Sequence, residues 1–169
     1  MSKYIIDTEA GTCQPYDELF KPNIADFLAQ YEGAKEYDGV VTAIQKWYYG
    51  SLVKAPWCAT CMSWAFNKLG IPVDQAENVY LLMRNCQYAA NQGHGTFYSK
   101  SELPPKLNRG DVCFLLLSGT TMTTTSSKHV TAFVEDAGVG RIRCIGGNQS
   151  DMIKVSDYDR SKLYAVYRP

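Results

Sequence analysis

The chain has 169 residues, and its 17 basic residues balance its 17 acidic ones. A formal net charge of zero gives no reason to expect nucleic acid or an anionic membrane as a partner. Apolar residues make up 46% of the chain, which is typical of one globular domain with a single core, and no apolar run approaches the ~20 residues that span a bilayer.

The first half of the chain is predicted to be helical after an irregular lead-in. Residues 1–22 contain scattered Gly and Pro, and the opening MSKYIIDTEAGTC has no apolar h-region, so synthesis without a signal peptide in a reducing cytoplasm is expected. Helical spacing of apolar residues follows in four segments, 24–31, 38–48, 58–69 and 77–91. Asp38 is expected to cap the second segment, and Gly70 to end the third in a left-handed conformation.

The second half is predicted to form strands. Five short apolar runs follow the turn-rich connector LPPKLNRGD, at 112–117, 129–135, 141–147, 152–158 and 163–169. Helices followed by strands favour an α+β fold, with N-terminal helices packed on a C-terminal antiparallel β-sheet. The whole chain, 1–169, is expected to be a single domain. The stretch SGTTMTTTSSK (118–128) is predicted to be a solvated loop, with a lid over a groove as the alternative.

The segment KAPWCATCMSW (54–64) permits two kinds of chemistry. A redox pair formed by Cys58 and Cys61, as in thioredoxin, requires a strand directly before the first cysteine. The preceding AIQKWYYGSLVKAP is instead helical and then loop-like, and Ala-Thr separates the two cysteines. A nucleophilic Cys58 at the first turn of a helix would face free backbone N–H groups, which predicts a lowered thiol pKa. Cys61 is then either a core residue or a partner that traps Cys58 as a disulfide.

A cysteine nucleophile needs a base and a group that orients it. The chain has two histidines, and His94 lies between glycines in QGHGT, in a predicted loop. His129 begins an alternating strand, HVTAFVE, and is the better candidate for the base. Asn148 follows the next strand, at the end that lies beside the start of its antiparallel neighbour, so the two side chains are expected to meet. Asp151 and Asp136 are the competing candidates for the orienting group.

Four segments, taken in order, carry a resemblance to a known family: PWCATCMSWAFNKLGI, GDVCFLLL, HVTAFVED and CIGGNQSDMIKVSDY. Together they resemble the CHAP / NlpC-P60 group of papain-like cysteine amidases and peptidases, in particular its compact phage and prophage branch. The resemblance covers about residues 40–169. It implies a papain-like core and a hydrolase that degrades the cell wall, cutting peptidoglycan in the stem peptide or at the N-acetylmuramoyl-L-alanine amide.

The resemblance also implies roles for particular residues. Cys58 matches the nucleophile, His129 the base and Asn148 the third member, a place where several relatives have Glu or a second His. The thiolate would attack an amide carbonyl, the backbone N–H of Cys58 would bind the oxyanion, and water would resolve the thioester. Residues predicted to bind substrate are Trp57, Tyr49, Gln149 and Asp151, and the candidates for a second oxyanion donor are Tyr48, Tyr49 and Gln149.

No cofactor is predicted, and zinc is a weak alternative because the chain has one C-x-x-C pair and two histidines. The expected partner is peptidoglycan, with no nucleic acid and no membrane, and the protein is expected to be a monomer. It would reach the cell wall after release by phage lysis, in a virion or through specialised secretion. Two other functions compete: a thiol oxidoreductase using Cys58 and Cys61, and an inactive binding module of the same fold.

Overall fold

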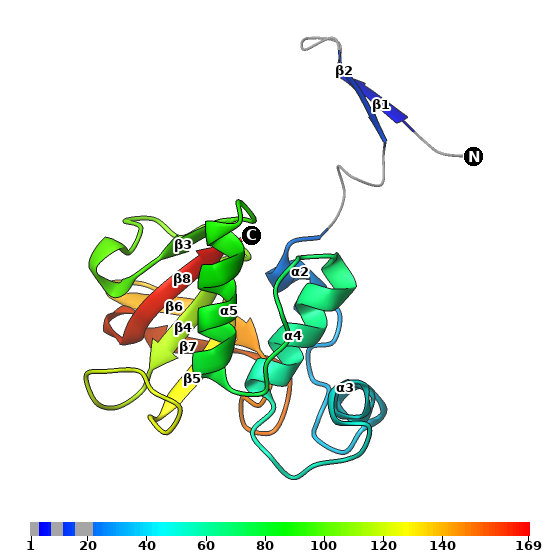
Figure 1. Ribbon diagram of the computed structural model, residues 1–169, viewed down its shortest axis with the longest axis vertical. Helices are drawn as coiled ribbons and strands as arrows, with labels where there is room; N and C mark the ends of the chain where they lie inside the picture. The colour runs from blue at the N-terminus through cyan, green and yellow to red at the C-terminus, as the bar shows by residue number, and fades with distance from the viewer. Residues whose placement is uncertain (1–3, 8–11, 16–21) are drawn as a thin grey trace.

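The computed structural model describes the backbone of residues 4–7 and 12–15 and the whole of residues 22–169 (Figure 1). Its larger part contains four helices and a six-stranded antiparallel sheet, which confirms the predicted α+β class. The helices are α2 (Ile24–Ala29), α3 (Gly39–Tyr49), α4 (Cys58–Leu69) and α5 (Val79–Asn91). Across the described ranges of the chain, none of the helices is long and apolar enough to cross a membrane.

Local sequence signals set the ends of the helices. The Asp38 side chain accepts a hydrogen bond from the Val41 N–H, so α3 begins where the cap was predicted. α4 ends at Gly70, which has a φ of 68° and adopts the expected left-handed conformation. α5 begins later than predicted because Asn78 caps it, accepting a hydrogen bond from the Tyr80 N–H at 2.9 Å.

The sheet has the strand order β3-β8-β4-β5-β6-β7, and every neighbouring pair is antiparallel. Its strands are β3 (Thr96–Tyr98), β4 (Val112–Leu116), β5 (Lys128–Asp136), β6 (Arg141–Gly146), β7 (Lys154–Asp159) and β8 (Leu163–Arg168). The five predicted strands are confirmed with small shifts at their ends. The three-residue β3 was missed, because its pairing with β8 leaves no pattern in so short a run.

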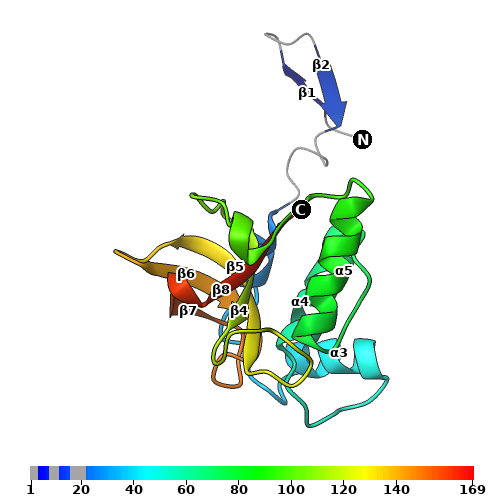
Figure 2. The same ribbon diagram turned by 60° about the vertical axis from the view of Figure 1, so that its left-hand side comes forward.

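The two faces of the sheet carry separate apolar clusters. One face, which includes Val130 and Ala132, packs on the helices and forms the larger core with them. Figure 2 shows α4 and α5 along this side of the sheet. The other face carries a smaller cluster that includes Leu115, Phe133 and Cys144. Side chains therefore alternate between two buried environments along β5.

Two predictions about loops need correction. The lead-in 1–22 is not wholly irregular, because Tyr4–Asp7 (β1) and Thr12–Pro15 (β2) pair as antiparallel strands. The adjacent β-branched residues Ile5 and Ile6 favour the strand conformation at this place. The remaining residues of 1–21 lie outside the described residues. The loop 118–128 is not fully solvated, since Met122 is 2% exposed and belongs to the larger core.

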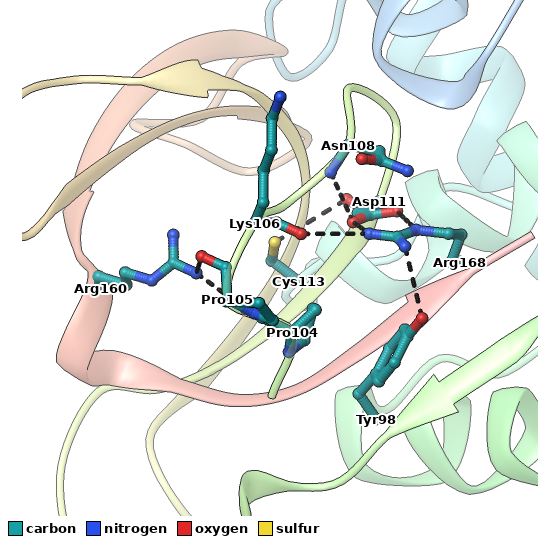
Figure 3. Close-up of polar contacts among 9 residues, drawn as sticks. All are labelled: Tyr98, Pro104, Pro105, Lys106, Asn108, Asp111, Cys113, Arg160 and Arg168. Carbon is teal, nitrogen blue, oxygen red and sulfur yellow. Dashed lines mark hydrogen bonds and ion pairs between the residues drawn. The ribbon is translucent and has the colours of Figure 1, made fainter. Parts of the chain in front are cut away.

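A buried ion pair ties the end of β8 to the start of β4 (Figure 3). Arg168 donates to both carboxylate oxygens of Asp111, with Nε–Oδ1 and Nη2–Oδ2 distances of 2.8 and 2.7 Å. Asp111 is 2% exposed, and Arg168 also donates to the Tyr98 hydroxyl at 3.4 Å. The pair holds the C-terminal strand in the middle of the sheet.

We expect Asp111→Ala to lower the free energy of unfolding by about 1.5–3 kcal/mol, because Arg168, whose side chain is 29% exposed, and the Asn108 N–H both lose a buried carboxylate partner. Asp157→Ala is the matched control, since Asp157 pairs with Arg143 at the surface. Its loss should be below about 1 kcal/mol. Urea unfolding of both variants measures the difference, and equal losses would show that the buried pair is no stronger than the exposed one.

Candidate active site

Cys58 is the first residue of α4, and that helix start has no side-chain cap within the described part of the chain. The first helical N–H to bond backward belongs to Cys61, which donates to the Trp57 carbonyl at 2.8 Å. Earlier N–H groups of the first turn have no intrahelical partner. Those of Cys58 and Ala59 stabilise a negative charge on the Cys58 sulfur, and so does the N–H of Val130 on β5. The sulfur therefore lies among backbone donors from two elements.

A groove of about 510 Å³ opens over Cys58. One group of its lining residues precedes or begins α4, a second surrounds the start of α5, and a third comes from the loop 118–128 and the start of β5. These are Tyr49, Val53, Ala55, Pro56 and Cys58; Glu77, Asn78 and Val79; and Thr124, Ser126, Ser127 and Lys128. The Asn78 side chain donates to the Thr124 carbonyl at 3.2 Å, which fastens the loop to α5. The Thr-rich loop is thus a wall of the groove.

The predicted lowering of the Cys58 pKa is wrong in direction. Burial raises the pKa of the Cys58 thiol, because the side chain is only 6% exposed and its charged form would lose hydration. The backbone N–H groups and the Lys128 ammonium act in the predicted direction, but burial outweighs them. Cys58 is therefore a neutral thiol before substrate binds.

His129, on β5, belongs to a buried polar cluster with Gln149 and Tyr158. Its Nε2 lies 3.3 Å from Gln149 Oε1, and its ring centroid is 5.9 Å from that of Tyr158. Gln149 Nε2 donates to the Lys154 carbonyl, and the Tyr158 hydroxyl donates to Gln149 Oε1. Because Oε1 can only accept, the proton of His129 must be on Nε2, and Nδ1 carries the lone pair. The Gln149 amide thereby fixes the tautomer of His129.

The group that contacts His129 is Gln149, not Asn148 as predicted. Strand alternation from Cys144 through Gly146 would place residue 148 on the face that carries His129. Asn148 instead has a left-handed conformation, with a φ of 59°, so the next residue takes that place. Asn148 lines a small separate hollow with Asp151. The left-handed turn within Gly-Gly-Asn-Gln was the signal that could have moved the assignment by one residue.

Cys58 and His129 approach β5 from different sides. Val130 faces α4, so alternation places the His129 side chain on the opposite face, with Leu115 and Thr131. Although both are described, no hydrogen bond joins the Cys58 thiol to the imidazole, and His129 is not among the groove-lining residues. The pairing of β5 with β6 ends at Ala132, so the part of β5 that carries His129 is paired only with β4. The Cys58 thiol therefore lies beside the backbone N–H of Val130, the residue that follows His129, and not beside the imidazole.

Burial also determines the charge of His129. It lowers the pKa of the imidazole to about 4, and the hydrogen bond with Gln149 offsets only part of this effect. His129 is therefore neutral at pH 7 and does not form a resting ion pair with a Cys58 thiolate. The resting pair is a neutral thiol and a neutral imidazole.

The other predicted site residues have different places. Trp57 is 1% exposed and packs in the core, where a Cβ on Gly147 would lie 2.5 Å from its ring, so it does not line the groove as predicted. Tyr49 does line the groove, and its hydroxyl is 3.3 Å from Thr60 Oγ1. Gln149, 5% exposed, is occupied with His129 instead of facing the groove. Asp151 is exposed beside Asn148.

Cys61 is a core residue. It is fully buried, and burial raises the pKa of its thiol to about 12. A Cβ on Gly147 would lie 2.6 Å from its Cβ, which shows how closely the turn after β6 packs against α4. Cys58 and Cys61 are both free thiols. In the described part of the chain, no group of three or more His, Cys, Asp or Glu side chains is arranged to hold a metal ion.

The chain was also compared with known proteins. Comparisons with family models, with curated proteins and with solved structures found no match.

The lowered pKa of His129 predicts a pH dependence of stability. In the unfolded chain, His129 has a pKa near 6.5 and binds a proton below that pH. In the folded chain, His129 binds this proton only below about pH 4. The free energy of unfolding should therefore fall by up to about 3 kcal/mol as the pH falls through this range. Urea unfolding at pH 7 and pH 4.5 should show a smaller fall for His129→Gln than for the wild type. His94→Gln, at an exposed position, is the control, and a wild-type fall in His129→Gln would contradict the assignment.

Lys128 is the one cationic residue among those described as lining the groove, and its charge favours the Cys58 thiolate. Its ammonium donates to the Thr124 and Ser126 carbonyls at 2.7 and 2.9 Å. We expect Lys128→Met to raise the thiol pKa further and to slow iodoacetamide alkylation by about two- to fivefold at pH 8. Lys128→Arg should keep the wild-type rate. If the alkylation rates of Lys128→Met and the wild type depend on pH in the same way, the Lys128 charge does not affect the pKa of the Cys58 thiol.

Proposed function

We propose that the protein is a papain-like cysteine amidase or endopeptidase that cleaves peptidoglycan. The observation that carries the proposal is the position of Cys58, whose sulfur lies at an uncapped helix start, among free N–H groups and at the base of a groove. Such a start supplies both a nucleophile and donors for an oxyanion. The peptidoglycan substrate comes from the resemblance of four sequence segments to the CHAP / NlpC-P60 group.

In the proposed reaction, the imidazole first turns around the free edge of β5, and His129 Nδ1 then takes the thiol proton as the Cys58 sulfur attacks the amide carbon. The carbonyl electrons move to oxygen, and the backbone N–H groups of Cys58 and Val130 bind the oxyanion. Val130 is thus the proposed second donor, in place of the side chains of Tyr48, Tyr49 and Gln149. The C–N bond then breaks, the imidazolium gives its proton to the leaving amine, and water hydrolyses the thioester to restore the thiol. Before substrate binds, Gln149 keeps the proton of the imidazole on Nε2, which leaves Nδ1 unprotonated for the first step.

A specific observation supports a second candidate, an inactive module that binds peptidoglycan. Cys58 and His129, both in the described part of the chain, share no hydrogen bond. Proton transfer through Nδ1 would require the imidazole to leave Gln149 and to move around the edge of β5 to the face that carries Cys58. A thiol oxidoreductase has less support, because complete burial of Cys61 keeps it from a second substrate thiol.

Digestion of purified sacculi, with the soluble products identified by mass spectrometry, tests the proposal. New amino and carboxyl termini within the stem peptide, or free stem peptides, would identify the bond, and Cys58→Ala should release none. If sacculi of several wall types yield no products, the proposal that the protein is a peptidoglycan hydrolase is wrong. Co-sedimentation with intact sacculi would then test the binding module, and an insulin-reduction assay would test the oxidoreductase.

A further inference from the structure

A second cavity, of about 610 Å³, is also lined by residues of the Thr-rich loop. Thr121 and Met122 of the loop line this cavity, whereas Thr124 and Ser126 line the groove. The start of α5 is shared in the same way: Val79 contributes to the groove, and the residue after it to the cavity. The loop and the first turns of α5 therefore contribute residues to both spaces.

The second cavity combines aromatic walls with positive charge. Tyr80, Phe97 and Tyr164 supply the aromatic surface. Arg84 and Lys100 supply two cationic groups, and no acidic residue lies among the described lining residues, so we call the space the cationic cavity. A mainly apolar pocket of several hundred Å³ with a few polar groups is typical of sites for small ligands.

The two cations are available to a ligand. Neither Arg84 nor Lys100 forms an ion pair with any residue that the structure describes. The Lys100 ammonium lies 5.7 Å from the centroid of the Tyr164 ring, a cation–π distance that keeps it on the cavity wall. The Glu102 carboxylate accepts a hydrogen bond from Ser99 at 2.9 Å and forms no ion pair with either cation.

We infer that the cationic cavity binds a carboxylate-bearing part of the stem peptide while the amide to be cleaved lies over Cys58. The inference rests on the proposed function and adds a second contact region for the same substrate. Stem peptides carry free carboxylates along a flexible chain, and the Thr-rich loop and α5 border both spaces, so one extended peptide is proposed to contact both. Arginine and lysine bind carboxylates, and the aromatic wall covers the apolar part of the peptide.

Kinetics with Arg84→Gln/Lys100→Gln tests the inference. Removing both charges should raise KM for soluble muropeptides by about tenfold with kcat unchanged, because the cavity is remote from the reacting atoms. Arg84→Lys/Lys100→Arg, which keeps both charges, should stay within about twofold of the wild type. Lys46→Gln/Lys68→Gln is the matched control, since both lysines are exposed on α3 and α4 outside the cavity. If KM is unchanged in Arg84→Gln/Lys100→Gln and turnover still depends on Cys58, the cationic cavity does not bind the substrate. The proposed hydrolase function would not be affected by this result.

A binding experiment separates the failure of the cavity from the failure of the hydrolase. The probe is the tripeptide L-alanyl-γ-D-glutamyl-L-lysine, titrated into ¹⁵N-labelled Cys58→Ala protein, with the carboxylate-amidated tripeptide as control. We expect shifts at Tyr80, Lys100 and Tyr164 and about tenfold weaker binding of the amidated peptide. These shifts would support the cavity even if sacculi were not cleaved. Equal binding of both peptides, or no shifts at these residues, would overturn it.

Discussion

Cys58→Ala is expected to reduce peptidoglycan hydrolysis by at least about 10³-fold, whereas Cys61→Ala should keep most of the wild-type rate. A covalent mechanism fails without its nucleophile, and the surviving backbone donors give little catalysis alone. Cys61 lies one turn along the same helix but is fully buried, so its loss affects packing and not the groove. Release of soluble fragments from sacculi measures both rates, and circular dichroism checks that each variant is folded.

The pair of variants also separates the competing functions. A thiol oxidoreductase that uses Cys58 and Cys61 would lose activity in both variants. A binding module would retain its affinity for sacculi in both variants and cleave nothing in either. Equal hydrolysis by Cys58→Ala and the wild type would remove the sulfur from the mechanism altogether.

The elements of the fold were predictable because their signals are local. α4 carries apolar residues at helical spacing and ends at Gly70, which takes the left-handed conformation that glycine favours. β4 and β5 show the apolar runs of buried strands. The pairing of β3 with β8 joins segments about 70 residues apart, and the ion pair of Asp111 with Arg168 spans 57. Neither contact could be predicted from a short segment of the sequence, because its two partners lie so far apart along the chain.

The errors at the candidate site have a common origin in tertiary structure. The helix start favours a lowered Cys58 pKa, and the structure preserves this effect, but the depth of burial that reverses the direction depends on how β5 packs over α4. Because Asn148 has a left-handed conformation, the side chain of Gln149, and not that of Asn148, contacts His129. In both cases the sequence identified the correct segment, and the side-chain environment decided the outcome.

His129→Ala should reduce kcat by at least about 10³-fold if the imidazole is the base, and the neighbouring amides give a sharper test of how it is positioned. Gln149→Ala should lower kcat by about ten- to a hundredfold, because the imidazole loses the acceptor that keeps its proton on Nε2. Asn148→Ala is the matched control, since Asn148 does not contact His129, and it should remain near the wild-type rate.

A charge at position 149 distinguishes a role in proton transfer from a role in packing. In Gln149→Glu, a carboxylate beside the imidazole should raise the His129 pKa from about 4. The base is active when unprotonated, so activity is lost as the pH falls through the His129 pKa. The acidic limb of the kcat/KM profile should consequently move to higher pH in Gln149→Glu, while Gln149→Ala lowers the plateau. If the new carboxylate only perturbed packing, Gln149→Glu would lower the whole profile without moving this limb, and that result would remove His129 from the proton-transfer step.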